Sequence, residues 1–106
     1  MQYFDKKLPA EKTVLTFNMA AGLLNGNLLS GVPTVAVSVY SGVDASPGAV
    51  LNGAAGLDST STLILVPVQG GLNGVEYLFE VECGTSLTTT LLGLQAVLPV
   101  GPLYFQ

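Results

Sequence analysis

The stretch that decides the fold is residues 75–83, which read VEYLFEVEC. Tyr77, Phe79, Val81 and Cys83 occupy alternate positions, and Glu or Leu side chains occupy the positions between them. Such alternation is typical of a strand that packs one face on a core and turns the other to solvent. The stretch therefore predicts a half-buried β-strand with its carboxylates outside.

Working outward from this stretch, the rest of the chain also reads as short strands. Segments rich in Gly, Asn, Ser and Pro separate them, and no helical period is present. We expect the further strands over residues 13–19, 28–31, 32–40, 50–54, 60–68 and 88–100. About seven strands at a spacing of roughly 8–12 residues predict an all-β, immunoglobulin-like antiparallel β-sandwich. An up-and-down barrel is the main competing architecture.

The approach to the deciding strand resembles a tyrosine corner. In immunoglobulin-like sandwiches a Tyr near the start of the sixth strand bonds backbone a few residues upstream through its hydroxyl. Asn73, Gly74 and Tyr77 are the candidate residues for this structural corner, and Tyr40 is a candidate for the buried aromatic on the preceding strand. The alternative is that Tyr77 is one more core residue, because the glycines within residues 70–74 supply a corner by themselves.

Charge is scarce and unevenly placed. Of the 106 residues only 9% are charged, the net charge is −4, and 49% are hydrophobic. The cations are Lys6, Lys7 and Lys12, so the rest of the chain is purely anionic. Nucleic-acid binding needs several cations per site, and an anionic membrane surface repels such a body. No apolar run is long enough for a membrane helix. We expect exposed apolar area, protein partners and a homo-oligomer.

The charge distribution also predicts three parts. Residues 1–12 form an extended N-terminal arm, residues 13–100 form the β-sandwich domain, and residues 101–106 form a tail whose last four residues match a tag-cleavage remnant. We expect Lys6, Lys7 and Lys12 to pair with acidic patches on a neighbouring protein. The arm is then ordered only in an assembly, and removing it leaves a folded domain.

The residues needed for catalysis are scarce. The chain has no His and only one Cys, so neither a Ser–His nor a Cys–His pair is possible, and a zinc site has a single ligand. We predict no enzymatic activity, no catalytic residues and no cofactor, and Cys83 as a small core residue. Glu80 and Glu82 point to one strand face at about 7 Å, a spacing open to a hard cation, although a solvated strand face is the simpler interpretation.

Several motifs resemble those of small Ig-like virion structural proteins of tailed bacteriophages, across residues 6–100. They lie at residues 7–12 (KLPAEK), 15–17 (LTF), 35–44, 70–77 (GGLNGVEY), 85–86 and 96–100 (AVLPV). The resemblance implies a domain in the virion, assembled in the bacterial host cytoplasm. It implies binding to other virion proteins, either as a capsid cement or decoration protein or as a head or tail-fibre adaptor, and it carries over no catalytic residues. The alternative is a carbohydrate-binding or adhesive β-sandwich module, although Tyr3, Phe4 and Tyr104 lie near the chain ends and few aromatics remain for a stacking platform.

Overall fold

The computed structural model describes residues 2–23, 26–86 and 91–101. Within these ranges the chain is mostly β, which confirms the all-β prediction. The strands are β1 (Gln2–Tyr3), β2 (Thr13–Asn18), β3 (Leu29–Ser41), β4 (Gly56–Leu57), β5 (Leu63–Val68), β6 (Glu76–Thr85) and β7 (Leu91–Pro99). Two short 3-10 helices, η1 (Ala20–Gly22) and η2 (Pro47–Val50), interrupt them. The expected tail beyond Gly101 lies outside the described residues.

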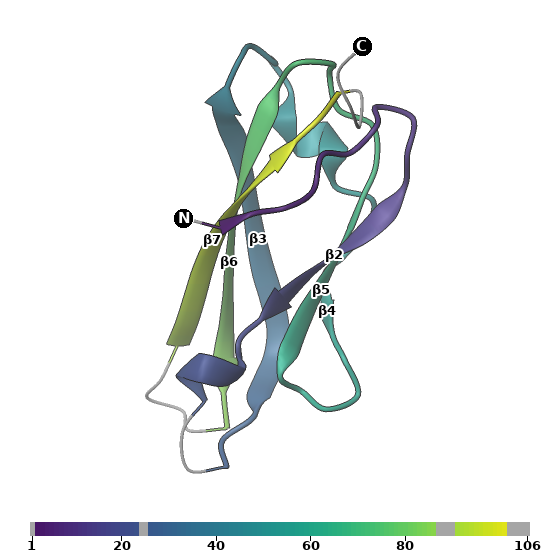
Figure 1. Ribbon diagram of the computed structural model, residues 1–106. Coiled ribbons are helices and arrows are strands. Elements are labelled where there is room, and N and C mark those ends of the chain that lie inside the picture. Colours follow the sequence, from purple (N-terminus) through teal and green to yellow (C-terminus); the bar gives the residue numbers. More distant parts are fainter. Residues whose placement is uncertain (1, 24–25, 87–90, 102–106) are drawn as a thin grey trace.

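The strands form two sheets that face each other (Figure 1). One sheet has the order β1-β7-β6-β3, and the other has the order β2-β5-β4. The four-stranded sheet is mixed rather than wholly antiparallel, because β1 runs parallel to β7 while β6 pairs antiparallel with both β7 and β3.

The core lies between the two sheets and follows the predicted alternation. In β6 the side chains of Tyr77, Phe79, Val81 and Cys83 are buried, as expected from the deciding stretch. Their partners from other strands include Phe17, Ile64, Val66 and Leu98, all fully buried. Fully burying one large apolar side chain contributes about 1.5–3 kcal/mol, so this interlayer cluster is the main source of stability.

The two strands expected over residues 28–31 and 32–40 are one strand, β3. The pairing of β3 with β6 shifts register between Ser30 and Thr34, and Gly31 within that irregularity has a φ of 88°. Glycine adopts such a positive φ at little cost, so the chain bulges there and continues instead of turning.

The strand expected over residues 50–54 is absent. Its first residue, Val50, ends η2, in which Pro47 stands in the first turn, where its fixed φ favours a helical start. Leu51 then forms a single bridge to Val68, and pairing resumes only at β4.

The N-terminal segment belongs to the four-stranded sheet, in contrast to the expected free arm. Gln2 and Tyr3 pair with Ala96 and Val97 of β7. The ring of Phe4 packs edge-to-face on Phe17, with 5.1 Å between centroids. The pairing covers the edge of β7, and the ring contact adds Phe4 to the core. The segment is therefore ordered within the single chain. Deleting residues 1–12 therefore removes a strand and part of the core.

Candidate functional site

Tyr77 sits at the centre of a hydrogen-bonded corner at one end of the four-stranded sheet. Its ring is fully buried. Its hydroxyl accepts a hydrogen bond from the backbone N–H of Leu72 at 2.9 Å and donates one to Oδ2 of Asp44 at 2.6 Å. The first bond is the upstream backbone contact that defines a tyrosine corner. The second ties the corner to the loop after β3, so one hydroxyl fixes two loops.

The glycines of the corner are required by its geometry. Gly71 has a φ of 97°, and a Cβ at this position would lie 3.0 Å from Val100 and 3.4 Å from the Tyr77 ring. Gly74, with a φ of 86°, donates its N–H to the carbonyl of Val100 at 2.9 Å. Asn73 is exposed between them. The predicted corner residues thus lie together, and the Oδ1 of Asn73 lies beside the buried Gly101.

The hydrogen bond between Tyr77 and Asp44 shifts the pKa values of the two groups in opposite directions. Burial, and next the bond to Asp44, raise the pKa of Tyr77, while the Leu72 N–H opposes that shift. The Tyr77 hydroxyl, and next the N–H of Ser46, lower the pKa of Asp44. The bond therefore favours a neutral phenol and an ionised carboxylate. No local pattern in the sequence marks Asp44, because its partner Tyr77 lies 33 positions away.

Lys7 is a structural cation rather than a contact for a partner. It is only 2% exposed, and its ammonium donates to the carbonyls of Gly70 at 2.6 Å, Leu8 at 2.8 Å and Pro9 at 3.4 Å. Burial lowers the pKa of Lys7, and the nearby Glu11 carboxylate partly opposes this. The prediction that Lys7 reaches a neighbouring protein is therefore wrong, because the carbonyl of Gly70 in the corner and those of Leu8 and Pro9 already hold its ammonium.

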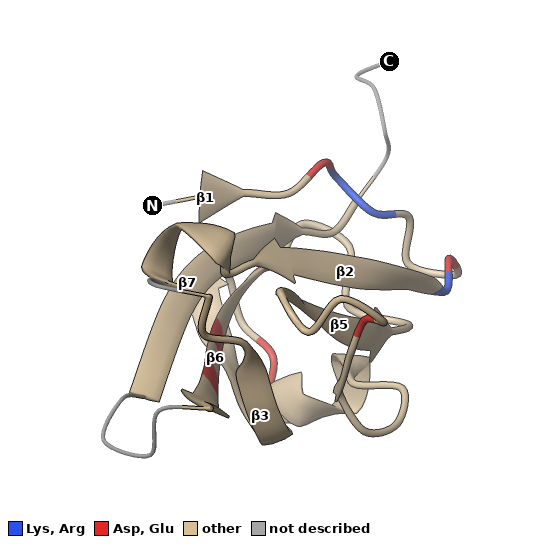
Figure 2. Ribbon diagram, turned by 90° about the horizontal axis from the view of Figure 1, so that it is seen from below, with Lys and Arg blue, Asp and Glu red and all other residues tan. Residues whose placement is uncertain are grey.

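Lys6 and Lys12 remain at the surface, on the segment between β1 and β2 (Figure 2). Each stands beside a carboxylate in the chain, Asp5 and Glu11 respectively. The segment thus carries alternating charge, and these two lysines alone of the three are accessible to a partner.

The outer face of the four-stranded sheet carries the second group of candidate residues. Tyr40, expected to be a buried aromatic, is 46% exposed because it points to this outer face. Its ring meets the ring of Tyr3 edge-to-face at a centroid distance of 6.2 Å. Hydrogen bonding with Tyr40 raises the pKa of Tyr3. The structure therefore brings Tyr3 of β1 into contact with Tyr40 of β3, although the two residues are far apart in the sequence.

Glu80 and Glu82 lie on the same outer face, as predicted. Both are exposed, and Glu80 accepts a hydrogen bond from Nε2 of Gln95 at 2.6 Å. Among the described residues no three His, Cys, Asp or Glu side chains gather to hold a metal ion. The simpler interpretation, a solvated strand face, agrees with this arrangement.

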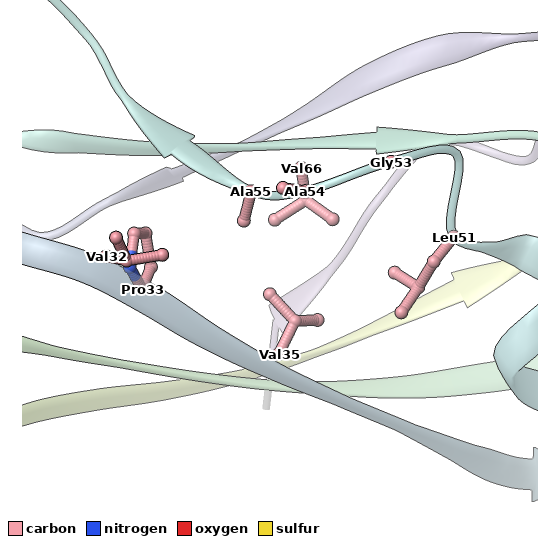
Figure 3. Close-up of a pocket in the computed structure, with 8 residues that line it drawn as sticks. All are labelled: Val32, Pro33, Val35, Leu51, Gly53, Ala54, Ala55 and Val66. Carbon is pink, nitrogen blue, oxygen red and sulfur yellow. The ribbon is translucent and has the colours of Figure 1, made fainter.

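An apolar pocket opens between β3 and the segment that leads to β4 (Figure 3). Its volume is about 200 Å³. Its lining is wholly uncharged, with Val32, Pro33 and Val35 from β3 facing Leu51, Gly53, Ala54, Ala55 and Val66.

No family model, curated protein or solved structure matches this chain. None of the helices in the described part of the chain has the length and apolar character to cross a membrane.

Proposed function

We propose that this chain is a non-enzymatic structural protein of a tailed-phage virion. It binds other virion proteins, as a capsid cement or decoration protein or as an adaptor between head or tail and a fibre. The resemblance of residues 6–100 points to this class of protein. The observation that carries the proposal is the way the corner presents exposed apolar side chains.

Two of these side chains form what we call the apolar tip, Val43 and Leu72. Val43 is 85% exposed and Leu72 is half exposed. Val43 precedes Asp44, whose carboxylate accepts a hydrogen bond from the Tyr77 hydroxyl. Leu72 donates its own backbone N–H to the same hydroxyl. A rigid base under exposed aliphatic groups lowers the entropy lost on binding, which is a property of a docking surface.

The proposal includes an immunoglobulin-like topology. The order β2-β5-β4 corresponds to strands B, E and D of that fold, and β3-β6-β7 corresponds to strands C, F and G. The bonded hydroxyl of Tyr77 supports the same assignment. Two features depart from antibody domains, because Phe79 stands in place of a cysteine and β3 has no buried Trp.

Binding to particles tests the proposal. Purified virions of the phage that encodes the chain are analysed by mass spectrometry and electron microscopy, and the chain is expected at a fixed copy number. Labelled chain is then added to particles that lack it. The tip variant Val43→Ser with Leu72→Ser is expected to lose most binding.

A matched control places the same change at the other end of the sandwich. Leu28 and Leu91 are exposed there, beside residues 84–86 at the end of β6. Leu28→Ser with Leu91→Ser is expected to bind like the unmodified chain. Absence of the chain from intact particles would exclude a virion role, and equal binding by both double variants would exclude the tip.

A second candidate is carbohydrate binding, favoured by the contact of Tyr3 with Tyr40. Both rings are about half exposed on one face. The edge-to-face geometry gives less flat surface for a sugar than parallel rings would. A glycan array showing binding that Tyr40→Ala abolishes would favour this candidate over the first.

A further inference from the structure

β3 is the longest strand at a sheet edge in the described part of the chain, and only at its start does a described backbone bond reach that edge, from the N–H of Leu29 to the carbonyl of Ser61. β3 ends the four-stranded sheet and pairs only with β6. Of the other strands at sheet edges, β1 and β4 have two residues each, and β2 has six and follows Lys12. Short length and flanking lysines protect strand edges from pairing with another chain. β3 has 13 residues and no charged side chain. Pro33 and two register shifts interrupt its edge, and residues 34–39 between the shifts carry none of these protections.

The segment beside β3 does not pair with this edge. Leu51 bridges to Val68, Asn52 donates its N–H to the carbonyl of Pro67, and β4 pairs with β5. The backbone groups of this segment thus bond to the opposite sheet. Between it and β3 lies the apolar pocket (Figure 3). The free edge therefore combines open backbone hydrogen-bonding groups with an apolar opening at its side.

The inward valines of β3 are incompletely covered. Val35, Val37 and Val39 pack against the core but stay only partly buried, whereas Phe79 and Val81 on the neighbouring β6 are fully buried. Another strand placed beside β3 covers these valines and extends the hydrogen-bond ladder. Such strand addition draws affinity from the main chain and specificity from alternate side chains.

We propose that the strand that pairs there is β3 of a second copy, in an antiparallel and symmetric dimer. The regular part of β3 is residues 34–39, between its two register shifts. Antiparallel pairing that keeps both inner faces on one side places valine opposite valine, whether it is centred on Ala36 or on Val37. The outer side chains that meet are then small and uncharged. Because the β3 edge is complementary to itself, a second copy of the chain is the partner that we propose. This dimer is a property beyond the proposed role in a virion.

Electrostatics permits this dimer although each copy carries a net charge of −4. No charged residue occurs between Thr13 and Val43, so no charge lies on either paired strand. The nearest carboxylates on the sheet, Glu80 and Glu82, belong to β6. Three strand spacings separate them from their copies, roughly 14 Å. That exceeds the Debye length of about 8 Å at physiological salt, so their repulsion is largely screened.

Sedimentation and hydrogen exchange of the purified chain test the proposal. In reducing buffer, which keeps Cys83 out of intermolecular disulfides, we expect a concentration-dependent dimer. Backbone amide hydrogen exchange of the unmodified chain is expected to slow over residues 34–39 at concentrations at which the dimer is populated. A monomer at every concentration, or a dimer with no change in this segment, overturns the proposal without using any variant.

Charge variants test the pairing directly. In Ala36→Lys with Ser38→Lys, lysines meet lysines in either register, and we expect the dimer to weaken at least tenfold. Gln95→Lys, on the outer face of the interior strand β7, is the matched control and is expected to leave the dimer unchanged. Mixing the lysine variant with Ala36→Glu plus Ser38→Glu is expected to restore dimers. If the lysine variant has the circular dichroism spectrum of the folded chain and still dimerises, the proposed β3 dimer is wrong.

These outcomes stay separate from the virion proposal. A chain found in particles but monomeric in solution refutes only the β3 dimer. A chain that dimerises through β3 but is absent from particles refutes only the virion role.

Discussion

Replacing Tyr77 by Phe removes one hydroxyl and keeps the buried ring. The Leu72 N–H then loses its acceptor, and the Asp44 carboxylate loses its shortest described hydrogen bond. An amide left without a partner costs about 1–3 kcal/mol, and because Leu72 is half exposed we expect about 1–2 kcal/mol. In a domain of this size that lowers the melting temperature by roughly 4–8 °C. Thermal and denaturant unfolding measure both quantities.

The difference between the unmodified chain and Tyr77→Phe also depends on pH. The pKa of Asp44 is depressed below 3.8, so its contribution is present above that value and is lost as pH falls through the folded pKa. The pKa of Tyr77 is raised above 10.0, so its contribution is present below pH 10 and is lost as pH rises through the folded pKa. The difference should therefore be largest near neutral pH. Tyr40→Phe is the control, and a Tyr77→Phe effect no larger than that of Tyr40→Phe would refute the corner.

Three further predictions concern the turns and the buried cation. Gly71→Ala should destabilise the protein more than Gly53→Ala in denaturant unfolding, because both have positive φ but only Gly71 lies against Val100; equal losses would assign the effect to backbone strain alone. Lys7→Met should cost at least about 1.5 kcal/mol, because three carbonyls lose a charged donor; an unchanged midpoint would contradict the structural role. The Thr60 hydroxyl, and next the backbone N–H groups of Leu63 and Thr62, lower the pKa of the Asp58 carboxyl to about 2. Asp58→Asn should therefore flatten the loss of stability between pH 4 and pH 2; parallel acid curves would argue against it.

The sequence predicted those strands whose two faces differ in polarity. β2 and β6 each follow an alternating stretch, and their observed bounds lie within two residues of the expected ones. The register of such strands is fixed because a shift by one residue exposes the whole apolar face. β5 instead follows a continuous apolar run, residues 63–68. The segment at residues 50–54 has no such difference in polarity between its faces. Pro47 favours the helical turn that ends at Val50.

The candidate site was harder to predict because it depends on contacts between distant parts of the chain. The bond from Tyr77 to Asp44 spans 33 positions, and the bond from Lys7 to the carbonyl of Gly70 spans 63. No local pattern marks either pair. A lysine near an N-terminus is ordinarily a solvated residue, so the burial of Lys7 becomes visible only once the corner is folded around it.

The β3 dimer and the apolar tip, both proposed here, have a joint geometric consequence. β3 ends at Ser41, and Val43 follows it directly. Antiparallel pairing of two β3 strands places their ends on opposite sides, so the two tips of a dimer point apart. A body with two separated docking ends can join two proteins, whereas a monomer with one tip can only cover a surface. The lysine variant of β3 should therefore still occupy single sites on particles, but it should no longer join two docking proteins in one complex, because it has one tip instead of two.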